Sequence, residues 1–358
     1  MKQDHNMPIK IRRLTVRNYK GIDELEMDFP IPKMPGDPDI LVMGSRNGLG
    51  KTSIIECCSL LLLALASDEE RFKFHHGRGT IDIPDLLIKA GSGHAEIGGD
   101  VVIDDEPISF EIRLDRHGNI KKSRDLLHKT KFIDRLFNPE RDTDELIAAI
   151  CGFSPNPVIE NTFLLFHSYR KVQEGNPELG MMVDRGRSLR YRTSRNEFPM
   201  SAFKLRILRS LMRQANLFEL VDDREPDETI GKLNELVQFY AGGTISKLRP
   251  SSDNTVDFRV NPEKGGESFT FDGLSSGQKE IISTLFLIWY HTKNRPSVVF
   301  IDEPELHLNA QWHRSFINRL MGLAPQNQYI IATHSEDVMD SVSEDRRILL
   351  LDNEEGTK

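Results

Sequence analysis

The chain has 358 residues, of which 38% are hydrophobic and 28% charged, and its formal net charge is −8. This composition favours a soluble globular protein with one large or two ordinary domains and excludes a uniformly basic nucleic-acid-binding surface. Three cysteines without metal-ligand spacing indicate reduced thiols rather than a disulfide framework. The longest apolar stretch is too short to span a bilayer and no secretory signal precedes it, so we expect a cytoplasmic protein without membrane association.

The first elements expected are two strands in the stretch IKIRRLTVRNYKGIDELEMDFP, where apolar and polar residues alternate around a short turn. A short apolar run, a glycine-rich turn and a helix follow in DILVMGSRNGLGKTSIIECCSLLLLALAS. Because this helix is apolar almost all round, we expect it to be buried.

The turn GSRNGLGKTS has the strand-turn-helix context of a P-loop. Glycines allow backbone N–H groups to face phosphate oxygens, while Lys51 can reach the outer phosphates and Thr52 can ligate Mg²⁺. The spacing departs from the rule at Ser45, which stands where a glycine is expected, with Gly44 beside it. A glycine-rich turn with a surface lysine is the alternative. The predicted nucleotide-binding residues here are Ser45, Arg46, Asn47, Gly48, Leu49, Gly50, Lys51, Thr52 and Ser53.

The middle of the chain mixes several signals. Residues 94–120 continue the strand-and-turn pattern, and helical spacing follows in DTDELIAAICGF, in SAFKLRILRSLMRQANLFELV and in IGKLNELVQFYAGG. Between Arg170 and Arg213, eleven basic residues stand against four acidic ones. This basic segment is either a solvated or acidic-protein-binding surface, or a nucleic-acid contact in which Tyr191 stacks on a base.

A hairpin in residues 256–272 leads to LSSGQ, which resembles a second phosphate-binding turn at a helix start. An ordinary Ser/Gly N-cap is the alternative. The predicted ligand-binding residues are Ser275, Ser276, Gly277 and Gln278.

Two later strands also end in chemically useful residues. RPSVVFIDEPELHL places Asp302 and Glu303 at the end of an apolar strand, where Asp302 would hold Mg²⁺ and Glu303 would deprotonate the attacking water. NQYIIATHSED ends in His334, which could reach the γ-phosphate. A solvated acidic turn and a hydrogen-bonded structural histidine are the alternatives. The predicted catalytic residues are therefore Glu303, His334 and Lys51, and the predicted metal ligands are Thr52 and Asp302.

This ordered set of motifs resembles the ABC-type ATPases. The stretches IRRLTVRNYKGI, SRNGLGKTS, LSSGQKEI, FIDEPELHLNAQW and IIATHS are similar to the soluble RecF/SMC/OLD-like branch, over roughly residues 9–67 and 255–351. The resemblance implies an α/β P-loop ATPase head: a mixed or parallel sheet flanked by helices, an antiparallel β subdomain and a helical insertion. The implied division is 1–140 with the P-loop, 141–250 as the helical and basic-loop insertion, and 251–358 with the signature LSSGQ, the Asp302–Glu303 pair and His334.

The resemblance also implies ATP and Mg²⁺ as cofactors and a homodimer or higher oligomer, in which the signature of one head binds the ATP of the other. By the same resemblance Asn309 would lie near the dimer seam, and His167 or Gln173 would occupy the place of a phosphate-sensing glutamine. No heptad pattern long enough for a coiled coil separates the P-loop from LSSGQ, and we expect no nuclease domain in the same chain. It is therefore similar to stand-alone ATPases of anti-phage systems, such as Septu- or PARIS-like modules, which act with a separately encoded effector. A RecF-like DNA-repair ATPase and an ATP-locked scaffold with little turnover are the alternatives.

Overall fold

The computed structural model describes residues 8–45, 48, 50–66, 71–73, 83–123, 143–153, 157–170, 203–204, 207, 228–245, 248–250, 256–306 and 308–350. The chain divides into two compact units. Unit 1 comprises Met1–Tyr169 with His291–Lys358, and unit 2 comprises Arg170–Tyr290. No helix in the described part of the chain is long and apolar enough to cross a membrane.

Unit 1 contains a largely parallel sheet in the strand order β16-β3-β15-β14-β9-β8. Its strands are β3 (Asp39–Ser45), β8 (Val158–Ile159), β9 (Phe163–Phe166), β14 (Val298–Asp302), β15 (Gln328–Thr333) and β16 (Arg347–Leu350). β8 pairs antiparallel with β9, and the other pairs are parallel. β14 and β15 are buried along their whole length, as expected for central strands covered on both faces.

A second sheet of unit 1 is antiparallel, in the order β2-β1-β5-β6-β7-β4. Its strands are β1 (Ile9–Tyr19), β2 (Ile22–Asp28), β4 (Arg71–Lys73), β5 (His94–Ile103), β6 (Glu106–Asp115) and β7 (Asn119–Lys122). Buried and exposed residues alternate along β6, so one face of the sheet packs on the core. The strands expected from the alternating pattern are confirmed.

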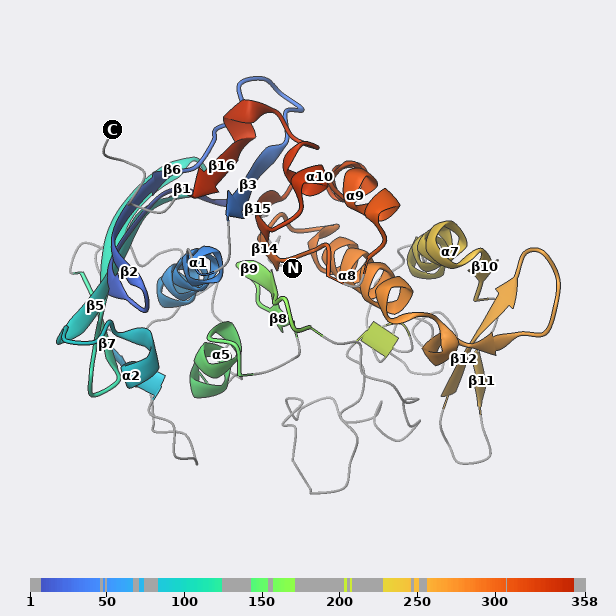
Figure 1. Ribbon diagram of the computed structural model, residues 1–358, viewed down its shortest axis with the longest axis horizontal. Helices are drawn as coiled ribbons and strands as arrows, with labels where there is room; N and C mark the ends of the chain where they lie inside the picture. Colours follow the sequence, from blue (N-terminus) through green and yellow to red (C-terminus); the bar gives the residue numbers. More distant parts are fainter. Residues whose placement is uncertain are drawn as a thin grey trace, which may run out of the picture. The chain divides into compact units, whose positions relative to one another are not determined.

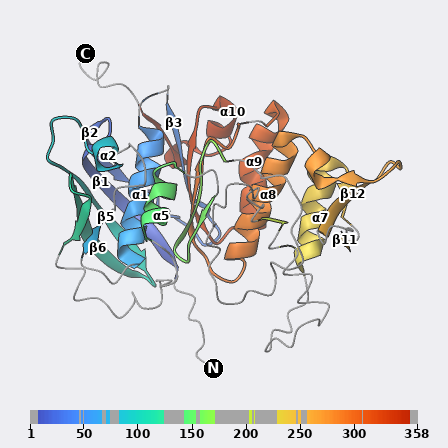
Figure 2. The same cartoon turned by 90° about the horizontal axis from the view of Figure 1, so that it is seen from below.

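Helix α1 (Lys51–Ala66) lies between the two sheets (Figures 1 and 2). It contacts β1, β5 and β6 of the antiparallel sheet and β3, β14 and β15 of the parallel sheet. All of its residues are buried except Thr52 and Ser53, which confirms the helix expected to be apolar all round. α5 (Thr143–Ile150) packs beside α1 (Figure 2). The remaining described helices of unit 1 are α2 (Ile83–Leu87), α9 (Ala310–Leu323), α10 (Glu336–Met339) and the 3-10 turn η4 (Glu344–Arg346).

Unit 2 combines helices with a small antiparallel sheet. Its described elements are α7 (Glu228–Ala241), β10 (Gly243–Thr244), β11 (Leu248–Pro250), β12 (Val256–Pro262), β13 (Phe269–Thr270), η3 (Phe271–Gly273) and α8 (Ser276–Thr292), whose last two residues belong to unit 1. β12 pairs with β13 as the expected hairpin. The Phe203 ring packs against the rings of Phe271 and Phe286, each at a centroid distance of 5.3 Å.

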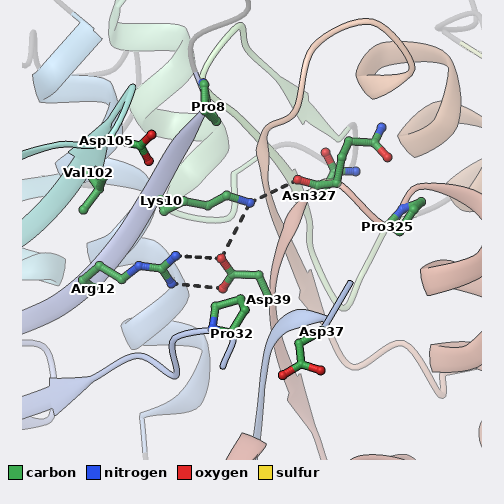
Figure 3. Close-up of a pocket in the computed structure, with 11 residues that line it drawn as sticks. Pro8, Lys10, Arg12, Pro32, Asp37, Asp39, Val102, Asp105, Pro325 and Asn327 are labelled. Carbon is green, nitrogen blue, oxygen red and sulfur yellow. Dashed lines mark hydrogen bonds and ion pairs between the residues drawn. The ribbon is translucent and has the colours of Figure 1, made fainter. Parts of the chain in front are cut away.

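A partly buried polar cluster joins β1 to the amino ends of β3 and β15. Figure 3 shows its charged members, Lys10, Arg12 and Asp39. Arg12 donates two hydrogen bonds to Asp39, at 3.1 and 2.8 Å, and Lys10 lies 3.7 Å from the same carboxylate. The side-chain amide of Gln328 accepts from the Ile11 N–H at 2.7 Å and donates to the Ile11 carbonyl at 2.8 Å. A pocket of about 290 Å³ lies beside this cluster. Arg12 and Lys10 share the one Asp39 carboxylate, and with the Gln328 bonds to Ile11 they connect β1 of the antiparallel sheet to β3 and β15 of the parallel sheet.

An ion pair with a buried carboxylate fixes α1 against the end of β1. Glu56, which is 2% exposed, accepts from the Tyr19 hydroxyl at 3.0 Å and from the Lys20 ammonium at 2.7 Å. Burial raises the pKa of Glu56, and the nearby Lys20 and Tyr19 partly oppose this increase. The helix that begins at the glycine-rich turn is therefore held by both apolar packing and a buried charge pair.

Replacing Lys20 with Met is expected to lower the free energy of unfolding by about 3 kcal/mol at neutral pH, because it leaves a charged carboxylate buried without its cation. The pKa of Glu56 should rise further in the variant. A carboxyl group whose pKa is raised by folding contributes most stability at low pH, so the loss should shrink as the pH falls from about 7 to about 5.

Urea unfolding at the two pH values measures this effect. Lys33→Met is the matched control, because Lys33 forms an exposed pair with Asp345 at 2.9 Å. The pKa of Asp345 is lowered to about 2, chiefly by the Ser343 hydroxyl, so this control should respond equally at both pH values. A Lys20→Met loss that is the same at both pH values would contradict the buried pair.

Candidate nucleotide-binding site

Three parallel strands bring separate motifs to one edge of the sheet in unit 1. β3 ends at Ser45, β14 at Asp302 and β15 at Thr333. The register pairs Asp302 with Ala332 and Thr333 with Gly44, so the three ends lie side by side (Figure 1). Open parallel sheets bind ligands at this carboxyl edge.

The glycine-rich turn between β3 and α1 needs its glycines. Gly48 and Gly50 have φ values of 89° and 83°, a region that a side chain makes unfavourable. The Ile54 N–H then donates to the Gly50 carbonyl at 2.9 Å and starts the helix. Of the predicted loop residues, Ser45, Gly48, Gly50, Lys51, Thr52 and Ser53 lie in the described part of the chain, and Arg46, Asn47 and Leu49 lie outside it.

Ser45, which stands where the P-loop pattern has a glycine, contacts the P-loop lysine. The Lys51 ammonium donates to the Ser45 hydroxyl at 2.7 Å and to its carbonyl at 3.1 Å, and a glycine would lack the first of these acceptors. Gly44 has a different role, because a Cβ there would lie 2.8 Å from the sulfur of Met339 in α10. The lysine is thus held over its own loop by a side chain that the usual pattern does not contain.

Thr52 and Asp302 meet where α1 begins and β14 ends. The Thr52 hydroxyl donates to Asp302 Oδ2 at 2.9 Å, and Asp302 is 1% exposed. A hydroxyl and a carboxylate are hard oxygen ligands, which suit Mg²⁺. The described residues contain no group of three or more His, Cys, Asp or Glu side chains that could hold a metal by themselves. The pair therefore suits an ion that also binds water and phosphate oxygens.

Glu303 and His334 lie next to Lys51. Glu303 has a φ of 48°, and its N–H donates to the Ala332 carbonyl at 2.8 Å. The Nε2 atom of His334 is 3.3 Å from Glu303 Oε1, and its Nδ1 atom is 3.3 Å from Lys51 Nζ. Both contacts are satisfied when Nδ1 accepts from the ammonium and Nε2–H donates to the carboxylate. Burial lowers the pKa of Lys51, and the carboxylates of Glu303, Asp302 and Glu305 oppose this effect.

Glu305 also belongs to this group, although the sequence did not identify it as a site residue. Its Oε2 atom accepts from the Thr333 hydroxyl at 2.7 Å, and its Oε1 atom accepts from the His334 N–H at 2.6 Å. The signal in the sequence was a third carboxylate two residues after Glu303, on a turn that contains Pro304. This carboxylate ties the end of β14 to the end of β15.

The LSSGQ signature opens α8 in unit 2. Ser275 Oγ accepts from the Gln278 N–H at 3.3 Å, and Gln278 Oε1 accepts from the Ser275 N–H at 3.0 Å. This reciprocal arrangement is a capping box. The Gln278 side chain also donates to the Tyr240 carbonyl at 2.9 Å, while Ser275 and Ser276 are exposed. The N-cap considered as the alternative is therefore present, and phosphate binding at these residues remains a prediction.

The basic segment is described at only two of its eleven basic residues, and both are buried in ion pairs. Arg170 pairs with Glu280 at 2.8 Å, and Lys204 pairs with Asp272 at 2.6 Å. Lys204 is 1% exposed, and burial lowers its pKa. Neither residue belongs to a surface that could contact nucleic acid. The other nine, Lys171, Arg185, Arg187, Arg190, Arg192, Arg195, Arg206, Arg209 and Arg213, and also Tyr191, lie outside the described residues.

Two further residues considered in the sequence have local structural roles. Asn309 is the N-cap of α9, and its side chain accepts from the Trp312 N–H at 3.0 Å. His167, which is 2% exposed, contacts the Ala149 carbonyl through Nε2 at 2.8 Å and stacks on Tyr169. Gln173 lies outside the described residues.

Comparisons with known proteins identify the family of the chain and its fold. A family model described as "AAA domain, putative AbiEii toxin, Type IV TA system" matches residues 46–340. The chain is 23% identical to the Septu protein PtuA of Bacillus mycoides (strain KBAB4) over 355 residues, which cover 96% of this chain and 41% of PtuA. It is 28% identical over 151 residues to the Retron Vc95 probable ATPase of Vibrio cholerae serotype O1 biovar El Tor, covering 39% of this chain and 29% of that protein.

A solved SMC head, bound in its crystal to the C-winged helix domain of ScpA, has the same fold. The TM-score is 0.53 at 14% sequence identity, and the match covers 93% of this chain and 91% of that chain. The expected α/β head with mixed and antiparallel sheets is thereby confirmed. The chain spans about two fifths of the length of PtuA. This chain belongs to the AAA-domain family of the AbiEii type, and it has the fold of an ABC-type ATPase head.

Proposed function

We propose that the protein hydrolyses ATP with Mg²⁺ at the carboxyl edge of the parallel sheet in unit 1. The observation that carries this proposal is the 2.9 Å contact between Thr52 and Asp302, with Lys51, Glu303 and His334 gathered beside it. Residues from three strand ends converge on one place, which a solvated turn or a lone surface lysine would not require.

The side chains have distinct roles in this proposal. Thr52 and Asp302 hold Mg²⁺, which neutralises charge on the phosphates when it is bound. Lys51 leaves Ser45 and pairs with the outer phosphates. Glu303 accepts a proton from the attacking water, and His334 orients that carboxylate through its Nε2–H. Glu303 has a left-handed backbone conformation, a form of local strain that is concentrated at functional sites.

The LSSGQ signature supplies the second half of the site from another copy of the chain. Its exposed Ser275 and Ser276 stand at the start of α8, whose positive N-terminal end favours an anion. Two chains paired head to tail through these surfaces would enclose two ATP molecules. ATP binding and hydrolysis would then close and open the dimer.

The likeness to the Septu protein PtuA and to a retron ATPase supports a place in anti-phage defence. In that setting the nucleotide-driven change would act as a switch for an effector, a nuclease being one candidate. A RecF-like repair role would require stimulation of turnover by duplex DNA, and an ATP-locked scaffold would show slow turnover. Steady-state ATPase rates with and without DNA separate these functions.

Changing Glu303 to Gln should preserve ATP binding and reduce the hydrolysis rate by on the order of 10²-fold, because the amide cannot accept the proton from water. The matched control is Glu336→Gln, which removes the same charge from an exposed residue two positions after His334. Phosphate release and binding of a fluorescent ATP analogue are measured on both variants. A turnover number close to that of the unmodified protein would remove Glu303 from the role of general base.

Mixing two inactive variants tests whether the site is shared. Lys51→Ala lacks a working P-loop and Ser276→Arg lacks a working signature, so each alone should be inactive. A mixed dimer contains one intact P-loop facing one intact signature. An equal mixture should therefore recover about a quarter of the unmodified rate, because half of the dimers have one good site of two.

Lys51→Ala mixed with Glu303→Gln is the negative control, since no site in that mixed dimer has both an intact P-loop and an intact base. If the first mixture is no more active than this control, the shared site is wrong.

A further inference from the structure

The carboxylate of Glu305 bonds to two consecutive residues at the end of β15. It accepts from the Thr333 hydroxyl at 2.7 Å and from the His334 N–H at 2.6 Å, one bond to each oxygen. Thr333 is fully buried, whereas His334 is exposed. The carboxylate therefore fixes the point at which the chain leaves the sheet and the imidazole begins.

Glu305 is itself held by its turn. The Leu306 N–H donates to the Glu303 carbonyl at 3.2 Å, and the Leu308 N–H donates to the Glu305 carbonyl at 3.0 Å. Pro304 occupies the second position of the turn, where its fixed φ favours this geometry. The turn starts at Glu303, so one rigid segment carries both the predicted base and the carboxylate that holds the histidine.

The two contacts of the His334 ring would tolerate little movement of the residue. Its two ring nitrogens lie 3.3 Å from Lys51 Nζ and from Glu303 Oε1, at the long end of hydrogen-bond distances. A small shift of the His334 backbone would break either contact. The bonds from Glu305 oppose that shift, because they hold the backbone N–H of His334 and the side chain of the residue before it.

We propose that Glu305 is a positioning residue for ATP hydrolysis, which holds His334, and through it the Glu303 carboxylate, in the arrangement needed for turnover. This inference rests on the proposed ATPase function. The role involves geometry and not the charge of Glu305, and it includes no contact with the nucleotide. Turnover should therefore depend on Glu305, whereas nucleotide affinity should not.

Two substitutions separate geometry from charge. Glu305→Ala removes both bonds and should lower kcat by on the order of 10²-fold, as expected when a reacting group is displaced by about 1 Å. Glu305→Gln can keep both bonds, since its carbonyl accepts from the His334 N–H and its amide donates to the Thr333 hydroxyl oxygen. It should retain kcat within about fivefold. In both variants KM and the affinity for a non-hydrolysable ATP analogue should stay within about threefold.

A double-mutant cycle tests whether the effect passes through His334. In a His334→Ala background, Glu305→Ala should reduce kcat by less than about threefold, because the group that it positions is already missing. Glu336→Gln is the control for loss of a nearby carboxylate, and it should behave as the unmodified protein in every assay.

Three results would overturn the inference: equal losses in Glu305→Gln and Glu305→Ala, a full loss from Glu305→Ala in the His334→Ala background, or a fall in analogue affinity that accompanies the fall in kcat. If the unmodified protein does not hydrolyse ATP, the proposed function fails. If it does and Glu305→Ala is equally active, only the inference about Glu305 fails.

Discussion

The parallel register of β3, β15 and β14 is the constraint on which the site depends. It places Gly44 beside Thr333 and Ala332 beside Asp302, so that three loops leave the sheet at neighbouring points. The hydrogen bond from Thr52 to Asp302 then links the start of α1 to the end of β14 across β15. If the register slipped by one residue, every side chain on a strand would move to the opposite face, and the site would not form.

The buried parts of unit 1 maintain this register. α1 fills the space between the two sheets, the Glu56–Lys20 pair fixes it to β1, and Arg12 and Gln328 connect β1 to the opposite ends of the parallel strands. The Glu56–Lys20 pair and the contacts of Arg12 and Gln328 involve no predicted nucleotide ligand. They stabilise the two sheets against each other. The residues with positive φ, Gly48, Gly50 and Glu303, lie instead at the carboxyl edge of the parallel sheet, where ATP hydrolysis is proposed. In unit 2 the capping box of Ser275 and Gln278 gives the signature a comparably fixed start.

Much of this architecture could be predicted from the sequence, because its signals are local. The all-round apolar helix after the glycine-rich turn, the hairpin before LSSGQ and the strands ending at Asp302 and Thr333 follow from hydrophobic periodicity and turn residues. The features missed depend on tertiary contacts. The bonds that Glu305 accepts join residues 28 and 29 positions apart. The composition of the basic segment gave no sign that Lys204 would be buried against Asp272.

The shared, ATP-enclosing dimer is the central claim that we propose, and the concentration dependence of turnover tests it most directly. The rate of phosphate release per chain should be measured at saturating ATP over a range of protein concentrations, with light scattering on the same samples. A composite site predicts that the rate per chain rises with concentration and levels off as the chains become paired. A constant rate per chain, persisting where light scattering shows only monomer, would contradict the account.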